Sequence, residues 1–298
     1  AAGRYGELTP KGAQQHKDLI RRMYTNYPQV FTDGTHVDAR STYKTRAFLS
    51  MAAACVELKG LNPRLVITTD VSEHDAYYIK YKNPTYEEAH LANADSVYQA
   101  ADSVYIHPER LMKQLFINAD IVKDSRQLMT DLFELHGISQ SSYHQEDLSF
   151  LFTSQERYDL WQRNNFEWLR NFIETADTVI SSKKNCVTLR YGHDTNLAPL
   201  AALMGIDKLS FATADWQKIA DTYRTYRIIP MCGNIQLIFF HKLDNDDILV
   251  KLLLNEHEVT LPLPTDTAPY YHWKDVRNYW QKIVDAIELP AVDSNTTD

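Results

Sequence analysis

A buried strand that turns directly into a helix is the feature that most constrains the fold of this chain. The segment 187–191, Val-Thr-Leu-Arg-Tyr, has the composition of a strand and is followed by Gly192, and apolar residues then recur at helical spacing over 197–204. Strand, turn and helix in this order form the repeating unit of an open α/β sheet. The sequence therefore predicts an α/β fold, with ligands bound at the carboxyl ends of the strands.

Further helices and strands are predicted on both sides of this unit. Thr9-Pro10 predicts a helix start, because threonine can cap and proline fits the first helical position. A hydroxyl at Ser41 or Thr42 predicts the cap of the next helix, which we expect to end at Gly60. The other expected elements are a strand over 65–68, a helix over 155–181, and strands over 234–240, 248–254 and 259–263.

The segment 84–154 differs from the rest of the chain. It is rich in Asp, Glu, Gln and Tyr in helical patterns, with no convincing strand. We therefore expect residues 1–83 and 155–298 to form an open mixed or mostly parallel sheet with flanking helices. Residues 84–154 are expected to form a smaller all-helical insertion domain.

Composition limits the classes of function. The 298 residues are 44% hydrophobic, so the chain can bury a substantial core. The net charge of −8 argues against a nucleic-acid partner. No apolar run approaches the roughly 18 to 20 residues of a membrane helix, so no membrane association is expected. The three cysteines show no CxxC spacing, and no cofactor or metal is expected.

The turn Gly192-His193-Asp194-Thr195 is the most informative candidate site. It places an imidazole, a carboxyl group and a hydroxyl where a strand meets a helix. The helix N-terminus adds free N–H groups and partial positive charge, which favour an anion such as phosphate. The alternative is that Asp194 caps the helix and His193 is a structural histidine.

Arg40 is the second candidate, again where an extended segment meets a helix, with Lys44 nearby. A guanidinium binds phosphate oxygens in a planar, bidentate way. The alternative for Arg40 is a surface ion pair, and for Arg46 that is the only role we predict. Cleavage of a phosphate monoester needs a nucleophile, cations around the phosphoryl oxygens and an acid for the leaving alkoxide. Arg40 and His193 can supply the cations, and Asp194 can supply the acid.

Four blocks of residues occur in order over residues 6 to about 280. They are Gly6-Glu7-Leu8-Thr9-Pro10-Lys11-Gly12 with Gln15-His16, Ala39-Arg40-Ser41-Thr42 with Arg46 and Ser50-Met51, Arg190-Tyr191-Gly192-His193-Asp194-Thr195, and Ile229-Pro230-Met231 with Asn234. Together they resemble the second branch of the histidine phosphatase superfamily, which includes acid phosphatases, phytases and multiple inositol polyphosphate phosphatases.

The resemblance implies a phosphomonoester hydrolase that acts through a covalent phosphohistidine. Arg40 matches the family's phosphate-binding arginine, and His193 and Asp194 match its downstream pair, with the aspartate as proton donor. Thr195 and Lys44 are further candidates for contacts with substrate. The resemblance also implies a periplasmic or secreted protein, and a helical insertion that covers the carboxyl ends of the strands.

Two departures from the family pattern matter. The defining Arg-His-Gly-x-Arg motif is absent, and none of the eleven histidines replaces it. We expect this motif, with the nucleophile and two clamp arginines, on a strand upstream of Ala1. The second departure concerns the subfamily. Multiple inositol polyphosphate phosphatases often carry His-Ala-Glu where this chain has His193-Asp194-Thr195, which is the pattern of phytases and acid phosphatases. In contrast, the block 252–256 followed by Pro269-Tyr270-Tyr271 and Trp273 is similar to bacterial members of the inositol-polyphosphate group.

The small phosphorylated substrate expected from these features is a polyol or sugar phosphate, with inositol hexakisphosphate as the best candidate. Alternatives are a general acid phosphatase of small sugar phosphates, and a phosphate-ligand-binding protein that lacks the attacking group. A metal-dependent hydrolase is disfavoured, because adjacent His193 and Asp194 cannot easily face one ion and no further ligand cluster completes a site.

Overall fold

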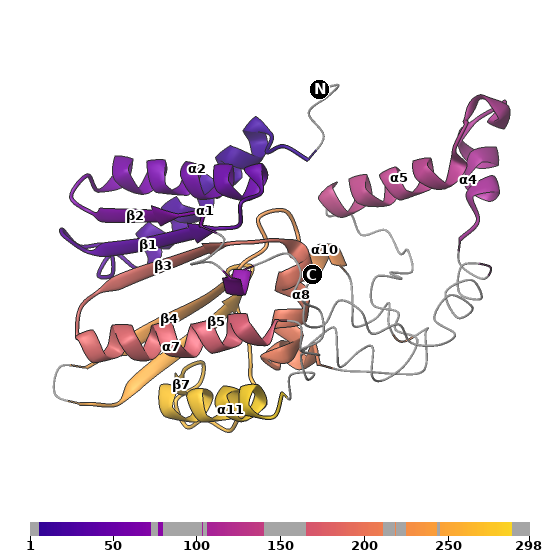
Figure 1. The fold of residues 1–298 in the computed structure, drawn as a ribbon. Helices are drawn as coiled ribbons and strands as arrows, with labels where there is room; N and C mark the ends of the chain where they lie inside the picture. The colour runs from indigo at the N-terminus through magenta and orange to yellow at the C-terminus, as the bar shows by residue number, and fades with distance from the viewer. Residues whose placement is uncertain are drawn as a thin grey trace, which may run out of the picture.

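The computed structural model has two layers of helices around β-strands (Figure 1). It describes residues 6–72, 77–79, 103, 106–139, 165–210, 218, 225–242 and 245–287. The elements are α1 (Pro10–Asn26), β1 (His36–Ser41), α2 (Thr45–Leu61), β2 (Val66–Asp70), η1 (Tyr77–Ile79), α4 (Pro108–Leu115), η3 (Ala119–Ile121), α5 (Ser125–Ser139), α7 (Phe166–Ser182), β3 (Cys186–Tyr191), α8 (Asp194–Leu203), η5 (Ile206–Lys208), α10 (Thr225–Ile228), β4 (Ile235–His241), β5 (Ile248–Leu254), β6 (His257–Glu258), β7 (Tyr271–His272) and α11 (Trp273–Asp285).

The first sheet is parallel, with strand order β2-β1-β3. Its register places Arg40 opposite Arg190 and Ser41 opposite Tyr191. Alternate residues of β1 are buried in a cluster with apolar side chains of α1 and α2, so these helices cover one face. Asp38 and Arg40 therefore point to the other face of the sheet. The predicted α/β fold with a parallel sheet is confirmed.

The second sheet is antiparallel, with order β4-β5-β6 and β7 paired with β5. It packs with α7, α8 and α11 in a second core. Trp280 of α11 is fully buried there, and its indole N–H donates to the carbonyl oxygen of Met204 at 3.2 Å. The strands predicted over 234–240 and 248–254 are confirmed as a hairpin.

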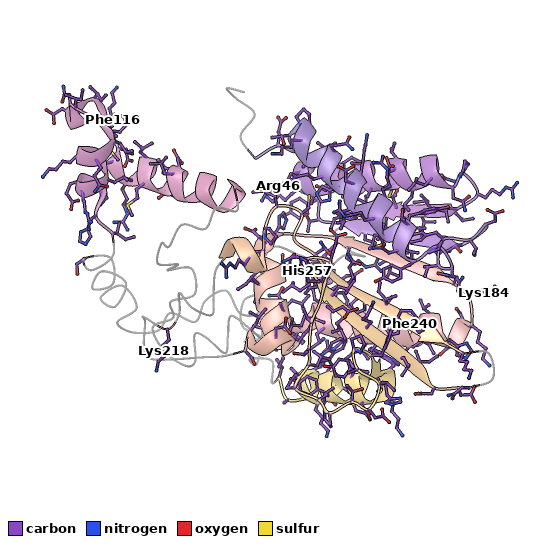
Figure 2. All side chains as sticks on the ribbon, turned by 180° about the vertical axis from the view of Figure 1, so that it is seen from behind. Arg46, Phe116, Lys184, Lys218, Phe240 and His257 are labelled. Carbon is purple, nitrogen blue, oxygen red and sulfur yellow. The ribbon has the colours of Figure 1, made fainter. Side chains whose placement is uncertain are left out.

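α1 packs on the first sheet and makes an ion pair with the turn after β5 of the second sheet. Besides packing on the first sheet, it sends Arg22 to the carboxylate of Glu256, next to β5, at 2.6 Å. Among the described residues, β3 pairs only with β1 and β4 only with β5. Each of these two strands thus has one edge without a described partner strand, and they are neighbouring ribbons in both views (Figures 1 and 2).

The first two helices differ in how they begin. The N–H of Gly12 donates to the Thr9 hydroxyl at 3.0 Å, which confirms the predicted cap of α1. The predicted cap of α2 at Ser41 or Thr42 is wrong, because the residue before this helix is Lys44 and no side chain caps it. The chain runs extended for longer than expected before the helix, which also passes Gly60 and ends at Leu61.

The strand predicted over 259–263 is also wrong. Two of its backbone N–H groups bond to side chains instead: Thr260 donates to Asp207, and Leu261 donates to the Tyr271 hydroxyl at 2.9 Å. Pro262 has no N–H to donate to a neighbouring strand. Only the two-residue strand β6 forms before this segment.

Helices α4 and α5 fall within the predicted insertion, and the described residues of 84–154 contain no strand. Residues 84–102 and 140–154 lie outside the described residues, so the boundaries of the insertion stay a prediction. The same holds for its expected cover over the strand ends. The first residues of the helix predicted over 155–181 also fall outside, and α7 matches the remainder. No described helix is long and apolar enough to cross a membrane.

Candidate active site

His193 lies where the carboxyl ends of β1 and β3 meet. The N–H of Thr42, just after β1, donates to the carbonyl oxygen of Tyr191 at the end of β3, at 3.0 Å. Two residues further, His193 is the residue before α8 and is only 9% exposed. Its Nε2 lies 3.1 Å from the hydroxyl oxygen of Thr42. The two strand ends thus fix the imidazole between them.

Arg46 is the second side chain that contacts this imidazole. It lies in the first turn of α2, at the end of the molecule where α8 also begins (Figures 1 and 2). Its Nη2 is 3.4 Å from Nδ1 of His193. A guanidinium only donates, so Nδ1 accepts, and a neutral His193 carries its hydrogen on Nε2 and donates it to Thr42. The contact assigns the tautomer of His193.

The surroundings of His193 favour the neutral imidazole. Burial lowers its pKa from the usual value of 6.5, and the positive charge of Arg46 lowers it further. The negative charge of Asp194 opposes this, and Lys44 makes a smaller contribution in the lowering direction. An anion bound between these cations would shift the balance toward the imidazolium.

The pKa of His193 therefore reports on its neighbours. We expect Arg46→Ala to raise this pKa, and inorganic phosphate to raise it in the unchanged protein, both measured by NMR titration of the imidazole.

The folded-state pKa of His193 lies below the usual value of 6.5, so just below pH 6.5 the unfolded chain binds more protons than the folded chain. The contribution of His193 to the free energy of unfolding therefore falls as the pH drops through 6.5. An unchanged pKa in Arg46→Ala would contradict the contact.

Arg40 lies on β1, which pairs with β3, the strand that leads to His193. The register places Arg40 opposite Arg190, three residues before His193. Its Nε is 3.3 Å from the carboxylate of Asp38, on the sheet face away from α2. Arg190 is buried and donates to the same carboxylate at 2.7 Å. One carboxylate thus holds two arginines. The guanidinium described against His193 is that of Arg46, an exposed residue for which the sequence analysis predicted only a surface ion pair.

Asp194 and Thr195 occupy the first turn of α8, and both are exposed. The residue before the helix is His193, not Asp194, and no side-chain oxygen caps the free N–H groups there. A negative charge in the first turn is favourable, but it does not require the carboxyl group to fold back onto the backbone. Asp194 is therefore available to a ligand beside His193.

Lys44 precedes α2 and is exposed, with its ammonium 5.2 Å from the centre of the Tyr43 ring. The first turn of α2 contains no acidic residue. Arg46, Lys44 and the N-termini of α2 and α8 therefore form a local positive site on a chain of net charge −8.

Two glycines permit close approach around the site. A side chain on Gly192 would come within 3.0 Å of the Trp168 ring, so the turn before His193 packs directly on α7. Gly6, with a φ of +75°, lies against Arg46, since a Cβ there would be 3.7 Å from its Nη1. The segment before α1 thus leads to the Arg46 guanidinium.

Sequence reasoning missed Arg46 and Thr42. The available signal was position: both lie just after a strand of an α/β sheet, where ligands bind, and Arg46 lies in the first turn of the following helix.

In the described part of the chain, no group of three His, Cys, Asp or Glu side chains is placed to hold a metal ion.

Comparisons with known proteins extend over most of the chain. It is 22% identical over 337 aligned positions to multiple inositol polyphosphate phosphatase 1 of Gallus gallus, covering 98% of this chain and 74% of that one. Among solved structures, a Bifidobacterium longum multiple inositol polyphosphate phosphatase in complex with inositol hexasulfate superimposes with a TM-score of 0.65. The match is 17% identical and covers 93% of this chain and 80% of that one.

A phytase from Klebsiella sp. ASR1 gives a TM-score of 0.55 at 14% identity, covering 96% of this chain and 88% of that one. The chain has the histidine acid phosphatase fold. No family model matches the sequence. Within this histidine acid phosphatase fold, His193 and Arg46 lie at the carboxyl end of the parallel sheet, where ligands bind in open α/β folds.

Proposed function

We propose that this protein is a phytase-like phosphomonoesterase that removes phosphate from a phosphorylated polyol or sugar, with inositol hexakisphosphate as the best candidate. The observation that carries the proposal is the contact of Arg46 with His193, next to the exposed Asp194. This arrangement offers cations for phosphoryl oxygens and a carboxyl group for the leaving oxygen. The names of the similar proteins support the substrate class.

In the proposed reaction, Arg46 and His193 bind the oxygens of the transferring phosphoryl group. A nitrogen of a second imidazole, not that of His193, attacks phosphorus. The bond from phosphorus to the ester oxygen breaks, and Asp194 gives its proton to that oxygen. Water then attacks the phosphohistidine, and the Asp194 carboxylate takes a proton from it. Inorganic phosphate leaves, and both groups return to their starting state.

The attacking imidazole is proposed to come from the Arg-His-Gly-x-Arg motif on a segment upstream of Ala1. Two observations support this placement. Gly6, the first described residue, lies against Arg46, so the described part of the chain begins beside the site. Among the described residues, one edge of β3 has no partner strand. This edge ends two residues before His193, and a strand added there would present its side chains to the same place.

The decisive experiment compares the 298-residue chain with the full-length protein, meaning the protein with the upstream motif. Calorimetry with inorganic phosphate should show binding to both, and binding should weaken strongly in Arg46→Ala. Only the full-length protein should release phosphate from inositol hexakisphosphate. Turnover by the 298-residue chain at the same rate would place the nucleophile within it and refute the upstream assignment.

A second candidate function is a phosphate-ligand-binding protein without catalysis. It is favoured by the absence of the Arg-His-Gly-x-Arg motif from these 298 residues. A full-length protein that binds inositol hexakisphosphate but releases no phosphate would select this function over the enzyme.

A further inference from the structure

Lys44 stands out among the cations near the candidate active site. Two of the four basic residues of α1 are engaged elsewhere: Arg21 pairs with Asp18 and Glu57, and Arg22 pairs with Glu256. Within the described ranges, no carboxylate forms an ion pair with Lys44. Its charge is therefore available to an anionic ligand.

The position of Lys44 is suited to a ligand group next to the one at His193. It lies two residues before Arg46, which contacts the imidazole, and its charge makes the smallest contribution to the lowered pKa of His193. Yet its ammonium lies over the ring of Tyr43, which is itself 60% exposed. Lys44 is thus at the solvent rim of the site, while Arg46 contacts the imidazole.

We propose that Lys44, positioned by the ring of Tyr43, binds a second phosphate of the substrate, adjacent to the phosphate held by Arg46 and His193. The proposal rests on the proposed function and adds to it a preference for polyols with neighbouring phosphates over monophosphates. Lys44 and Tyr43 are specificity determinants, and neither takes part in bond breaking.

The chemistry of the two cations fits this division. A guanidinium holds two oxygens in a fixed plane, which suits a group that must be oriented for attack. An ammonium is a compact charge on a flexible stem and can donate to an oxygen in many directions, which suits a phosphate that is only held. An exposed cation–π contact is worth about 0.5–1 kcal/mol, enough to bias where the ammonium lies without fixing it.

The test compares binding of two probes to the 298-residue chain by calorimetry at one fixed salt concentration. We expect Lys44→Ala to weaken the binding of inositol hexakisphosphate by about tenfold, which corresponds to the loss of one charge-assisted hydrogen bond. Inorganic phosphate should be affected much less. Tyr43→Ala should give a smaller loss of the same selectivity, and Tyr43→Phe, which keeps the ring, should retain it.

The matched control is Lys274→Ala, which removes an exposed lysine from α11, on the far side of the molecule from α2 (Figure 1). It changes the net charge equally and should leave both affinities unchanged. Equal weakening of the two probes in Lys44→Ala, or loss of hexakisphosphate binding in Lys274→Ala to the same extent, would overturn the second-phosphate role. Failure of the full-length protein to bind either probe would instead refute the proposed function.

Discussion

Asp194→Asn in the full-length protein should slow hydrolysis of an inositol phosphate by about 10²- to 10⁴-fold, the usual contribution of a positioned general acid. The alkoxide of a polyol is a poor leaving group and needs the proton. An aryl phosphate with an acidic phenol needs it much less, so its hydrolysis should slow clearly less. The measurement is kcat for both substrates in both proteins.

The comparison of the two substrates separates catalysis from structure. Because Asp194 is exposed in the first turn of α8, asparagine there should be tolerated by the fold, which thermal unfolding can check. Equal losses for the alkyl and the aryl substrate would refute the general-acid role. Asp194 would then only stabilise the N-terminus of the helix through its charge.

Arg46→Ala is expected to lower kcat/KM by about 10²- to 10³-fold for alkyl and aryl phosphates alike, comparable to removing one preorganised donor from a transition state. The clamp stabilises the phosphoryl group whatever oxygen leaves, so the ratio of the two substrates should not change. Arg46→Lys should recover only part of the loss, because an ammonium does not reproduce the planar fork.

Arg40→Ala is the matched control, since it also removes a guanidinium, from β1, the strand that precedes α2. Arg40 bonds to Asp38 on the sheet face away from α2, so we expect a much smaller effect on kcat/KM. A large loss in Arg40→Ala with little change in Arg46→Ala would reverse the assignment. It would restore the sequence-based hypothesis that Arg40 is the phosphate clamp.

Local chemistry made much of the fold predictable. Thr9 before Pro10 set the start of α1, and the segment 187–191 before Gly192 predicted a strand followed by a helix. The expectation failed where backbone groups found distant partners. The N–H groups of Thr260 and Leu261 bond to Asp207 and Tyr271, a pairing that no local pattern in 259–263 reveals.

The sequence by itself determined the α/β class and the turn that carries His193 and Asp194, because both depend on the order of neighbouring residues. Only the tertiary structure decided which arginine meets the imidazole. Arg40 and Arg46 are six residues apart, but strand alternation turns Arg40 toward Asp38, and the later start of α2 brings Arg46 within 3.4 Å of His193. That choice depends on the register of β1 against β3, which brings together residues about 150 positions apart, and such long-range pairing leaves no periodic signal in the sequence.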